Sequence, residues 1–207
     1  MSGRRRFSEV SGFVLAGGQS RRMGLDKARL RFGSERLVER QIRLLHAICH
    51  SVSIIGPPDR FADAGVQVYE DEIPGKGPLG GIYTGLQRAR TEFSLFLSCD
   101  LPFTEARFLR YLCEQALASR ALATVPPPWG KGRYPLCAIL RRRVLLRIRS
   151  YLASGQNQVG RFLLNCQPRT ISMAESARAG FFPRIFCNLN TREEYEMARQ
   201  QFEAYEQ

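Results

Sequence analysis

The sequence predicts an α/β fold, a three-layer sandwich in which helices cover both faces of a mainly parallel β-sheet. Short apolar runs alternate with amphipathic segments along the chain, which is the pattern typical of such folds. The most apolar runs, Ser11–Ala16 and Phe93–Ser98, have the length and composition of buried strands. Glycine-rich or acidic segments follow several of these runs, at the strand ends where α/β proteins bind ligands.

Apolar spacing and turn residues define the elements of the first half. Ser11–Ala16 is the first strand. Glu35–His50 is predicted to be a helix because its apolar residues recur at helical spacing: Leu37, Val38, Ile42, Leu45 and Ile48. A second strand, Val52–Ile55, is stopped by the Gly-Pro-Pro sequence at 56–58. A third strand, a helix and a fourth, strongly apolar strand follow: Val66–Tyr69, Gly80–Arg90 and Phe93–Ser98.

The second half begins with a helix at Thr104–Ser119, for which Thr104 is the expected N-cap. A fifth strand is predicted at Ala121–Val125, and another strand, Tyr134–Leu140, follows a proline-rich loop. Two helices come next, at Arg141–Leu152 and Gln158–Leu164. The chain closes with a short strand at Ile185–Leu189 and a helix at Thr191–Tyr205, which Thr191 caps. Gln167–Pro183 carries no readable pattern. We expect one domain over residues 1–207, with residues 1–10 as a flexible N-terminal extension.

Composition argues against several classes of protein. The apolar fraction is 44%, typical of a soluble globular chain, and no apolar run approaches the ~20 residues that a membrane-spanning helix needs. The N-terminus lacks the apolar middle section of a secretory signal, so we expect a cytoplasmic protein. The six cysteines form no C-x-x-C pair, and most have the apolar surroundings of buried free thiols, which argues against a disulfide framework or a structural zinc site.

The formal net charge of +12 raises the hypothesis of a nucleic-acid partner. The arginines, however, are spread along the chain and accompany no recognised nucleic-acid motif. A basic protein also suits highly anionic small ligands such as triphosphates, which we favour over nucleic acid. A steep salt dependence of duplex binding would support the nucleic-acid alternative.

The first strand ends in the glycine-rich segment Gly17–Lys27. Glycines at this position let the backbone approach a ligand closely and direct amide hydrogens at it. Arg21, Arg22 and Lys27 supply positive charge for a triphosphate. The segment is neither the dinucleotide fingerprint G-x-G-x-x-G nor a Walker A loop, because Gly24 is not followed by Lys-Ser or Lys-Thr.

Acidic residues follow two further predicted strands. Asp100 lies in the segment Cys99–Pro102 after the strand Phe93–Ser98, where a carboxylate can hold Mg²⁺ together with substrate phosphate oxygens. The alternative, that Asp100 caps the next helix, is less favoured because Thr104 is better placed for that role. Glu70–Glu72 follows the third strand and precedes the glycine-rich segment Pro74–Gly81, which alone would be interpreted as a solvated turn.

Taken together, these segments resemble the molybdenum cofactor guanylyltransferase family of nucleotidyltransferases. The similarity runs from Gly12 to about Met197, and the first of its motifs is specific for nucleotidyltransferases. Five segments carry it: Leu15–Lys27, Gly75–Ile82, Cys99–Pro102, Tyr134–Leu136 and Asn188–Thr191. The resemblance implies a Rossmann-like sandwich of the nucleotide-diphospho-sugar transferase type.

The resemblance also implies residue roles. The catalytic set is Arg21, Lys27 and Asp100: Arg21 and Lys27 hold the triphosphate, and Asp100 binds Mg²⁺, the implied cofactor. Asp71 contacts the nucleoside. The backbone of the first motif, at Leu15, Ala16, Gly17 and Gly18, meets the guanine and ribose-phosphate region. Asn188 and Asn190 face the pterin. Some family members have a nucleotide-binding asparagine after the second strand, where this chain has Ile55–Pro58.

The implied reaction transfers GMP from GTP to the terminal phosphate of molybdopterin or the molybdenum cofactor, with release of pyrophosphate. The implied partners are these substrates, other cofactor-biosynthesis proteins and client enzymes. The transfer depends on alignment and charge neutralisation, and the acceptor phosphate is already largely ionised, so no general base is required. His46 and His50 lie within or at the end of a predicted helix, away from the motifs, and Ser20 has no base partner.

Besides the nucleic-acid alternative, two others stay open. The first is a transferase of the same fold that uses CTP or a sugar phosphate. The sequence Ala-Gly-Gly at 16–18 resembles the GTP branch, since the CTP branch typically has Ala-Ala-Gly, and sugar-phosphate enzymes tend to be longer. The second is a nucleotide-binding module without turnover, against which the presence of both Lys27 and Asp100 argues.

Overall fold

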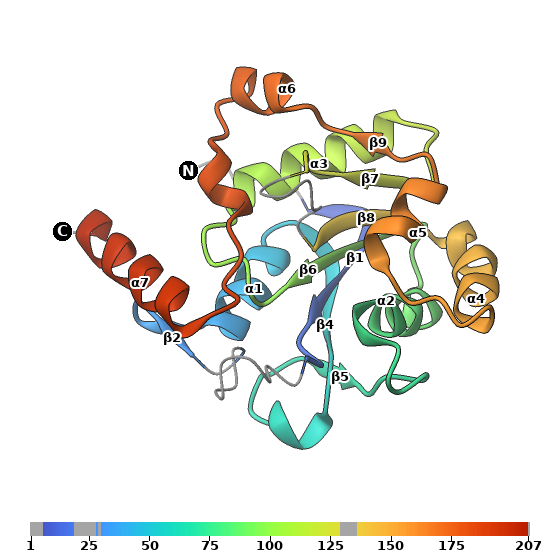
Figure 1. The fold of residues 1–207 in the computed structure, drawn as a ribbon, viewed down its shortest axis with the longest axis horizontal. Coiled ribbons are helices and arrows are strands. Elements are labelled where there is room, and N and C mark those ends of the chain that lie inside the picture. The colour runs from blue at the N-terminus through green and yellow to red at the C-terminus, as the bar shows by residue number, and fades with distance from the viewer. Residues whose placement is uncertain (1–5, 19–27, 29, 129–135, 207) are drawn as a thin grey trace.

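The computed structural model describes residues 6–18, 28, 30–128 and 136–206. A seven-stranded sheet crosses the molecule, and its strands lie in the order β5-β4-β1-β6-β8-β7-β9 (Figure 1). In that order their bounds are Gln67–Tyr69, Cys49–Ile55, Phe7–Leu15, Phe93–Ser98, Cys137–Arg141, Ala123–Val125 and Arg169–Thr170. β5, β4, β1 and β6 pair in parallel, whereas β8 is antiparallel to both of its neighbours.

Helices cover both faces of this sheet (Figure 1). Apolar side chains of α1 and α3 pack on one face, and those of α2, α4 and α5 pack on the other. The α-helices α1 to α7 span Leu37–His46, Gly77–Arg88, Ala106–Ala118, Leu145–Ala153, Val159–Asn165, Met173–Arg178 and Arg192–Glu206. Short 3₁₀ turns η2, η3 and η4 span Pro58–Arg60, Arg142–Val144 and Pro183–Phe186. The predicted three-layer α/β arrangement is therefore confirmed.

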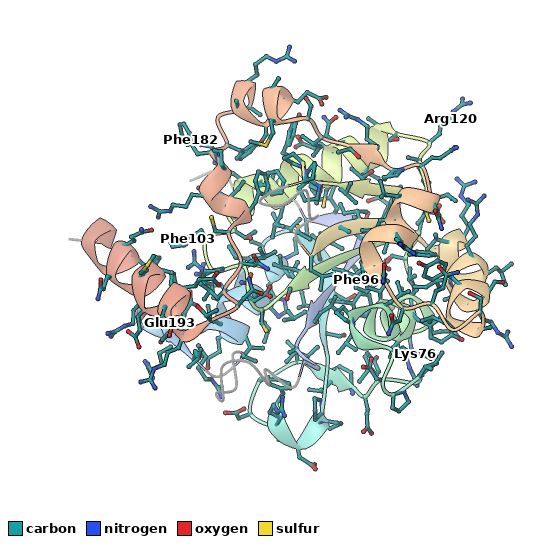
Figure 2. All side chains as sticks on the ribbon, in the orientation of Figure 1. Lys76, Phe96, Phe103, Arg120, Phe182 and Glu193 are labelled. Carbon is teal, nitrogen blue, oxygen red and sulfur yellow. The ribbon has the colours of Figure 1, made fainter. Side chains whose placement is uncertain are left out.

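Burial on both faces explains why the central strands appear in the sequence as continuous apolar runs. All residues of β6 are buried, and their side chains alternate between the two cores, as strand geometry requires. Phe96 points to the α2 side, where its ring stacks on Phe13 of β1 at a centroid distance of 5.3 Å. Figure 2 shows Phe96 near the centre of the sheet.

A third, smaller core lies away from the sheet. It joins the hairpin β2–β3 (Arg31–Phe32 and Glu35–Arg36) to helix α7 and to the segment after β6. The Phe32 ring contacts Phe103 edge-on at a centroid distance of 5.5 Å, and Tyr195 Oη donates a 2.5 Å hydrogen bond to Arg31 O. This third core anchors the C-terminal helix beside the segment that follows Ala28.

Two predictions near the N-terminus are wrong. The predicted flexible extension over residues 1–10 does not hold for Phe7–Val10, which are the first residues of β1, and Phe7 N donates to Ile48 O at 2.8 Å. The exposed residues Ser8 and Glu9 interrupt the apolar run and conceal this part of the strand. The helix predicted to reach His50 ends at His46, because Ile48 fills the core from a connection and β4 begins at Cys49.

Two further corrections concern the second half. Thr104 is buried, and its hydroxyl donates to Ile185 O at 3.4 Å; the N-cap of α3 is Glu105. The predicted strand Ile185–Leu189 is absent, because that segment begins within the 3₁₀ turn η4, from which Ile185 and Phe186 pack with α3. The cap of the last helix is confirmed, since Glu194 N donates to Thr191 Oγ1 at 3.2 Å.

The cysteines and the helices bear on two further expectations. All six cysteines are free thiols, and burial raises the pKa of Cys49 and of Cys137 to about 12. Thiols with such pKa values are un-ionised and unreactive at neutral pH. Within the described ranges, each helix is too short or too polar to cross a membrane.

Candidate active site

The site is built around the carboxyl end of β1, which lies between β4 and β6. Leu15 pairs with Ile55 on one side and with Ser98 on the other. Ala16 N still donates to Ile55 O at 2.9 Å, and Leu15 O accepts from Cys99 N at 3.4 Å. Leu15 and Ala16 are buried, but Gly17 and Gly18 are exposed. The backbone therefore leaves the sheet at Gly17, where its polar groups become accessible to a ligand.

Asp71, in the segment after β5, lies beside this strand end. A methyl group on the Cα of Gly17 would be 3.6 Å from Asp71 Oδ2, and one on Gly81 would be 3.4 Å from Asp71 Oδ1. Asp71 Oδ1 is buried and receives no hydrogen bond from the described residues. Burial raises the pKa of Asp71, and the negative charge of Glu70 raises it further. A buried acceptor without a donor is costly, which makes Asp71 a candidate for binding a ligand N–H or O–H group.

The glycine-rich segment before α2 brings this helix against the strand ends. Gly75 and Gly77 have φ values of 79° and 61°, a conformation that favours glycine, and α2 begins at Gly77. A methyl group on Gly81 would lie 3.2 Å from Leu15 Cδ2 and 3.3 Å from Ile55 Cγ2. Gly81 therefore permits close packing of α2 on β1 and β4, and this packing places the helix next to Asp71.

Asp100 occupies the neighbouring position, after β6, and is half-buried. Side chains of helix α1 bind the main chain of the segment that follows Asp100. Gln41 Nε2 donates to Leu101 O at 3.0 Å, and Arg40 Nε donates to Pro102 O at 2.7 Å. Gln41 is fully buried, and the sequence reasoning missed its role. The available signal was a polar residue on the apolar face of an amphipathic helix.

The two asparagines of the C-terminal motif lie next to Asp100 because Leu189, between them, donates its N–H to Asp100 O at 2.9 Å. The Leu189 side chain is buried in the third core, together with Phe103, which Figure 2 shows on the side of the molecule that carries α7. Asn188 is exposed, and its Nδ2 donates to Asn190 Oδ1 at 3.4 Å. The asparagine amides thus lie on the Asp100 side of β1.

The structure therefore brings most of the predicted site residues to one edge of the sheet. These residues form two groups. The first is the backbone of Leu15, Ala16 and Gly17, which lies next to Asp71 and Gly81. The second is Asp100 with Asn188 and Asn190. Gly18 is exposed just after β1. Arg21 and Lys27 lie outside the described residues, as do Tyr134 and Pro135.

The donor set at this edge fits Mg²⁺ better than a metal held by protein alone. Among the described residues, no three histidine, cysteine, aspartate or glutamate side chains form a metal-binding group. Mg²⁺ is commonly held by one or two carboxylates, with water and substrate phosphates completing its coordination. A single carboxylate at the end of a central strand, such as Asp100, meets that requirement.

Comparison with known proteins agrees with this geometry. Residues 12–171 match the MobA-like NTP transferase domain. The molybdenum cofactor guanylyltransferase of Syntrophotalea carbinolica is 34% identical over 194 residues, which cover 92% of this chain and 91% of that protein. The corresponding enzyme of Haemophilus influenzae is 32% identical over 158 residues, or 74% of this chain and 82% of the relative.

Solved structures support the fold. Molybdopterin-guanine dinucleotide biosynthesis protein A from Archaeoglobus fulgidus superposes with a TM-score of 0.79 at 17% identity, over 94% of this chain and 99% of the other. A CMP-2-keto-3-deoxy-manno-octonic acid synthetase gives a TM-score of 0.74 at 13% identity, over 96% of this chain and all of the other. The predicted Rossmann-like fold of the nucleotide-diphospho-sugar transferase type is confirmed.

The half-buried carboxylate of Asp71 generates a prediction about stability. Because the folded protein raises its pKa above the ordinary value of 3.8, ionisation of Asp71 disfavours the folded state. The resulting loss of unfolding free energy is absent well below pH 3.8, and it grows as the pH rises through the folded-state pKa of Asp71. Relative to the unmodified protein, Asp71→Asn should therefore gain unfolding free energy between acidic and neutral pH.

Urea unfolding at acidic and at neutral pH measures this difference. The control is Asp59→Asn, which alters an exposed aspartate in η2. A difference in unfolding free energy that stays constant with pH for Asp71→Asn would contradict the prediction.

Proposed function

The chain belongs to the MobA-like NTP transferase family, and we propose that it transfers GMP from GTP to the terminal phosphate of molybdopterin or of the molybdenum cofactor, releasing pyrophosphate. The observation that carries this proposal is the pair of carboxylates, Asp71 and Asp100, on either side of the glycine end of β1. Relatives named molybdenum cofactor guanylyltransferases align over most of the chain, which supports the choice of substrates.

Asp71 and the backbone of Leu15–Gly18 form the nucleoside side of the proposed site. Guanine presents donors at N1 and N2 and an acceptor at O6. Asp71 Oδ1, which receives no hydrogen bond from the residues the structure describes, can accept one from such a donor or from a ribose hydroxyl. Main-chain groups at the strand end can pair with the remaining polar atoms. The missing asparagine after β4 is not replaced by the N–H of Gly56, which already donates to Tyr69 O at 2.9 Å, so we assign this contact to main-chain groups at the end of β1.

The phosphate side of the site combines Asp100 with two basic residues of the first motif. We assign Arg21 and Lys27 to the triphosphate on sequence grounds, as guanidinium and ammonium groups neutralise phosphate charge. Asp100 would hold Mg²⁺ against phosphate oxygens. A bound Mg²⁺ supplies charge neutralisation at the α-phosphate and on the departing pyrophosphate.

In the proposed reaction, an oxygen of the acceptor's terminal phosphate attacks the α-phosphorus of GTP. A new P–O bond forms, and the bond between the α-phosphorus and the bridging oxygen of pyrophosphate breaks. An ionised phosphate needs no protein base to remove a proton. The positions of the histidines agree with this: His46 is the last residue of α1, where burial lowers its pKa, and His50 is near the start of β4, at the opposite end of the strands.

The acceptor side is assigned to Asn188 and Asn190. Their amides can donate to the pterin or its phosphate, and Leu189 fixes them relative to Asp100. We place the protein in the cytoplasm and expect it to pass its product to other cofactor-biosynthesis proteins or client enzymes.

The direct test is incubation of the protein with molybdopterin, Mg²⁺ and each of the four nucleoside triphosphates in turn, with pyrophosphate release as readout. We expect kcat/KM for GTP to exceed the values for CTP and ATP by roughly a hundredfold, because two unpaired buried polar groups cost ~1–3 kcal/mol each. Equal values for GTP and CTP would contradict guanine recognition. Absence of pyrophosphate release with all four would contradict nucleotidyl transfer itself.

Asp100→Asn should lower kcat on the order of 10²-fold while the protein stays folded, because the amide cannot replace the charge of the carboxylate. The measurement is steady-state kinetics over a range of Mg²⁺ concentrations, with circular dichroism to confirm folding. Excess EDTA should abolish turnover of the unmodified protein. A folded variant with near-normal kcat would show that the carboxylate has another role.

Gly17→Ala should weaken the use of GTP without disturbing the fold. The added methyl would lie 3.6 Å from Asp71 Oδ2, an ordinary van der Waals contact, and it would occupy the space beside the carboxylate. We expect KM for GTP to rise about tenfold, the equivalent of one lost hydrogen bond to a charged group. The control is Gly160→Ala in α5, where the methyl has no neighbour within 4 Å. An unchanged ratio of GTP to CTP use would contradict the role of Gly17.

A further inference from the structure

Helix α2 touches the Asp71 segment through more residues than Gly81. Thr84 and Arg88, one turn apart on this helix, both contact Glu72, the residue after Asp71. We refer to Thr84 and Arg88 as the α2 clamp. Neither residue belongs to a motif that the sequence analysis singled out, and neither touches the Asp71 carboxylate through a described hydrogen bond.

Thr84 uses its single hydroxyl in two directions. The side chain is fully buried; Oγ1 donates to Gly80 O at 3.1 Å and accepts from Glu72 N at 3.0 Å. The hydroxyl therefore satisfies a main-chain N–H that belongs to no strand or helix. Only a hydroxyl side chain of this size can both donate and accept here. This pair of bonds fixes the backbone immediately after Asp71.

Arg88 holds the same segment from its outer side. Its Nη2 forms an ion pair with Glu72 Oε1 at 2.9 Å, and the guanidinium lies over the Tyr69 ring, 5.3 Å from its centroid. Tyr69 is the last residue of β5, two positions before Asp71. Arg88 thus connects residues on both sides of Asp71, while Thr84 holds one of them.

The Asp71 carboxylate needs such support because none of the described residues donates a hydrogen bond to its buried Oδ1. Within the described part of the chain, the position of this oxygen therefore depends on the backbone that carries it and on the packing around it. Without the clamp, the segment can turn the carboxylate toward water, which removes the cost of burying an unpaired acceptor. A pre-organised acceptor binds a donor more tightly, because less ordering accompanies binding.

We propose that Thr84 and Arg88 are positioning residues for nucleoside recognition: they fix the backbone on both sides of Asp71 and keep its carboxylate beside Gly17, where the nucleoside binds. This inference rests on the proposed function, in which Asp71 contacts the nucleoside. It adds two residues that act through Asp71 and predicts how their effects combine with those of Asp71.

Thr84→Val keeps the shape of the side chain and removes the hydroxyl. We expect KM for GTP to rise about five- to tenfold, because the variant loses the hydrogen bond that Thr84 Oγ1 accepts from Glu72 N. We expect kcat and KM for molybdopterin to stay unchanged, because this bond supports only the part of the site that binds the nucleoside. Thr84→Ser should restore the KM. The matched control is Thr91→Val, because Thr91 Oγ1 also makes two hydrogen bonds, to Ser11 Oγ and Phe93 O, near the opposite ends of the strands.

Arg88→Gln tests the clamp independently if Thr84→Val fails to fold. Arg141→Gln is its matched control, because Arg141 likewise pairs with a glutamate, Glu92 at 2.9 Å, and lies over a ring, that of Phe93 at 4.4 Å, away from the site. We expect Arg88→Gln to raise KM for GTP and Arg141→Gln to leave it unchanged. Equal changes in both variants would overturn the positioning role of Arg88.

The combination of Thr84→Val with Asp71→Asn separates positioning from general stabilisation. If Thr84 acts through Asp71, the double variant should have the same KM for GTP as Asp71→Asn alone. Additive effects on KM would overturn the proposal. A second result would also overturn it: Thr84→Val folds and has a normal KM for GTP, whereas Asp71→Asn has a raised KM. That result would leave the proposed function intact. Failure of the unmodified protein to use GTP would instead refute the proposed function.

Discussion

The parallel pairing of β1 with both β4 and β6 is the constraint on which the rest of the structure depends. Because Leu15 is level with Ile55 and Ser98, the three strands end together, and main-chain bonds such as Ala16 N to Ile55 O extend the pairing just beyond them. Gly17 and Asp100 each lie two residues beyond the end of their strand, and Asp71 lies two residues beyond the end of β5, which pairs with β4. Residues far apart in the sequence therefore reach one edge through strand register.

The same edge holds a carboxylate oxygen, Asp71 Oδ1, to which no described residue donates a hydrogen bond. The surrounding packing compensates for this: Gly81 lets α2 approach within contact distance of Leu15 and Ile55, and Thr84 and Arg88 extend that packing to Glu72 and Tyr69. Helix, strand ends and the Asp71 segment form one unit. A binding site can retain an unpaired acceptor when its neighbours leave it no other position.

A structural feature could be predicted from the sequence when neighbouring residues determine it. β6 was predicted to the residue, because burial on both faces leaves an uninterrupted apolar run. The Ile185–Leu189 prediction failed because apolar residues that pack on α3 from a 3₁₀ turn resemble a strand. Strand-end aspartates are visible in a sequence, whereas Gln41 and Thr84 act on main-chain groups of distant segments, and that pairing emerges only when the chain is folded.

The proposed acceptor side comes from the C-terminal segment and not from the carboxyl end of β8. β8 is antiparallel to β6, so its carboxyl end at Arg141 pairs with Phe93, at the edge remote from the site. β8 instead brings its amino end to the site edge, where Cys137 pairs with Leu97 and Ser98 N donates to Leu136 O at 2.8 Å. The chain reaches Asp100 again after η4, where Leu189 N donates to Asp100 O and the Leu189 side chain inserts into the third core. Helix α7 and the hairpin β2–β3 pack around this connection, so the small core away from the sheet positions the two asparagines of the proposed acceptor side.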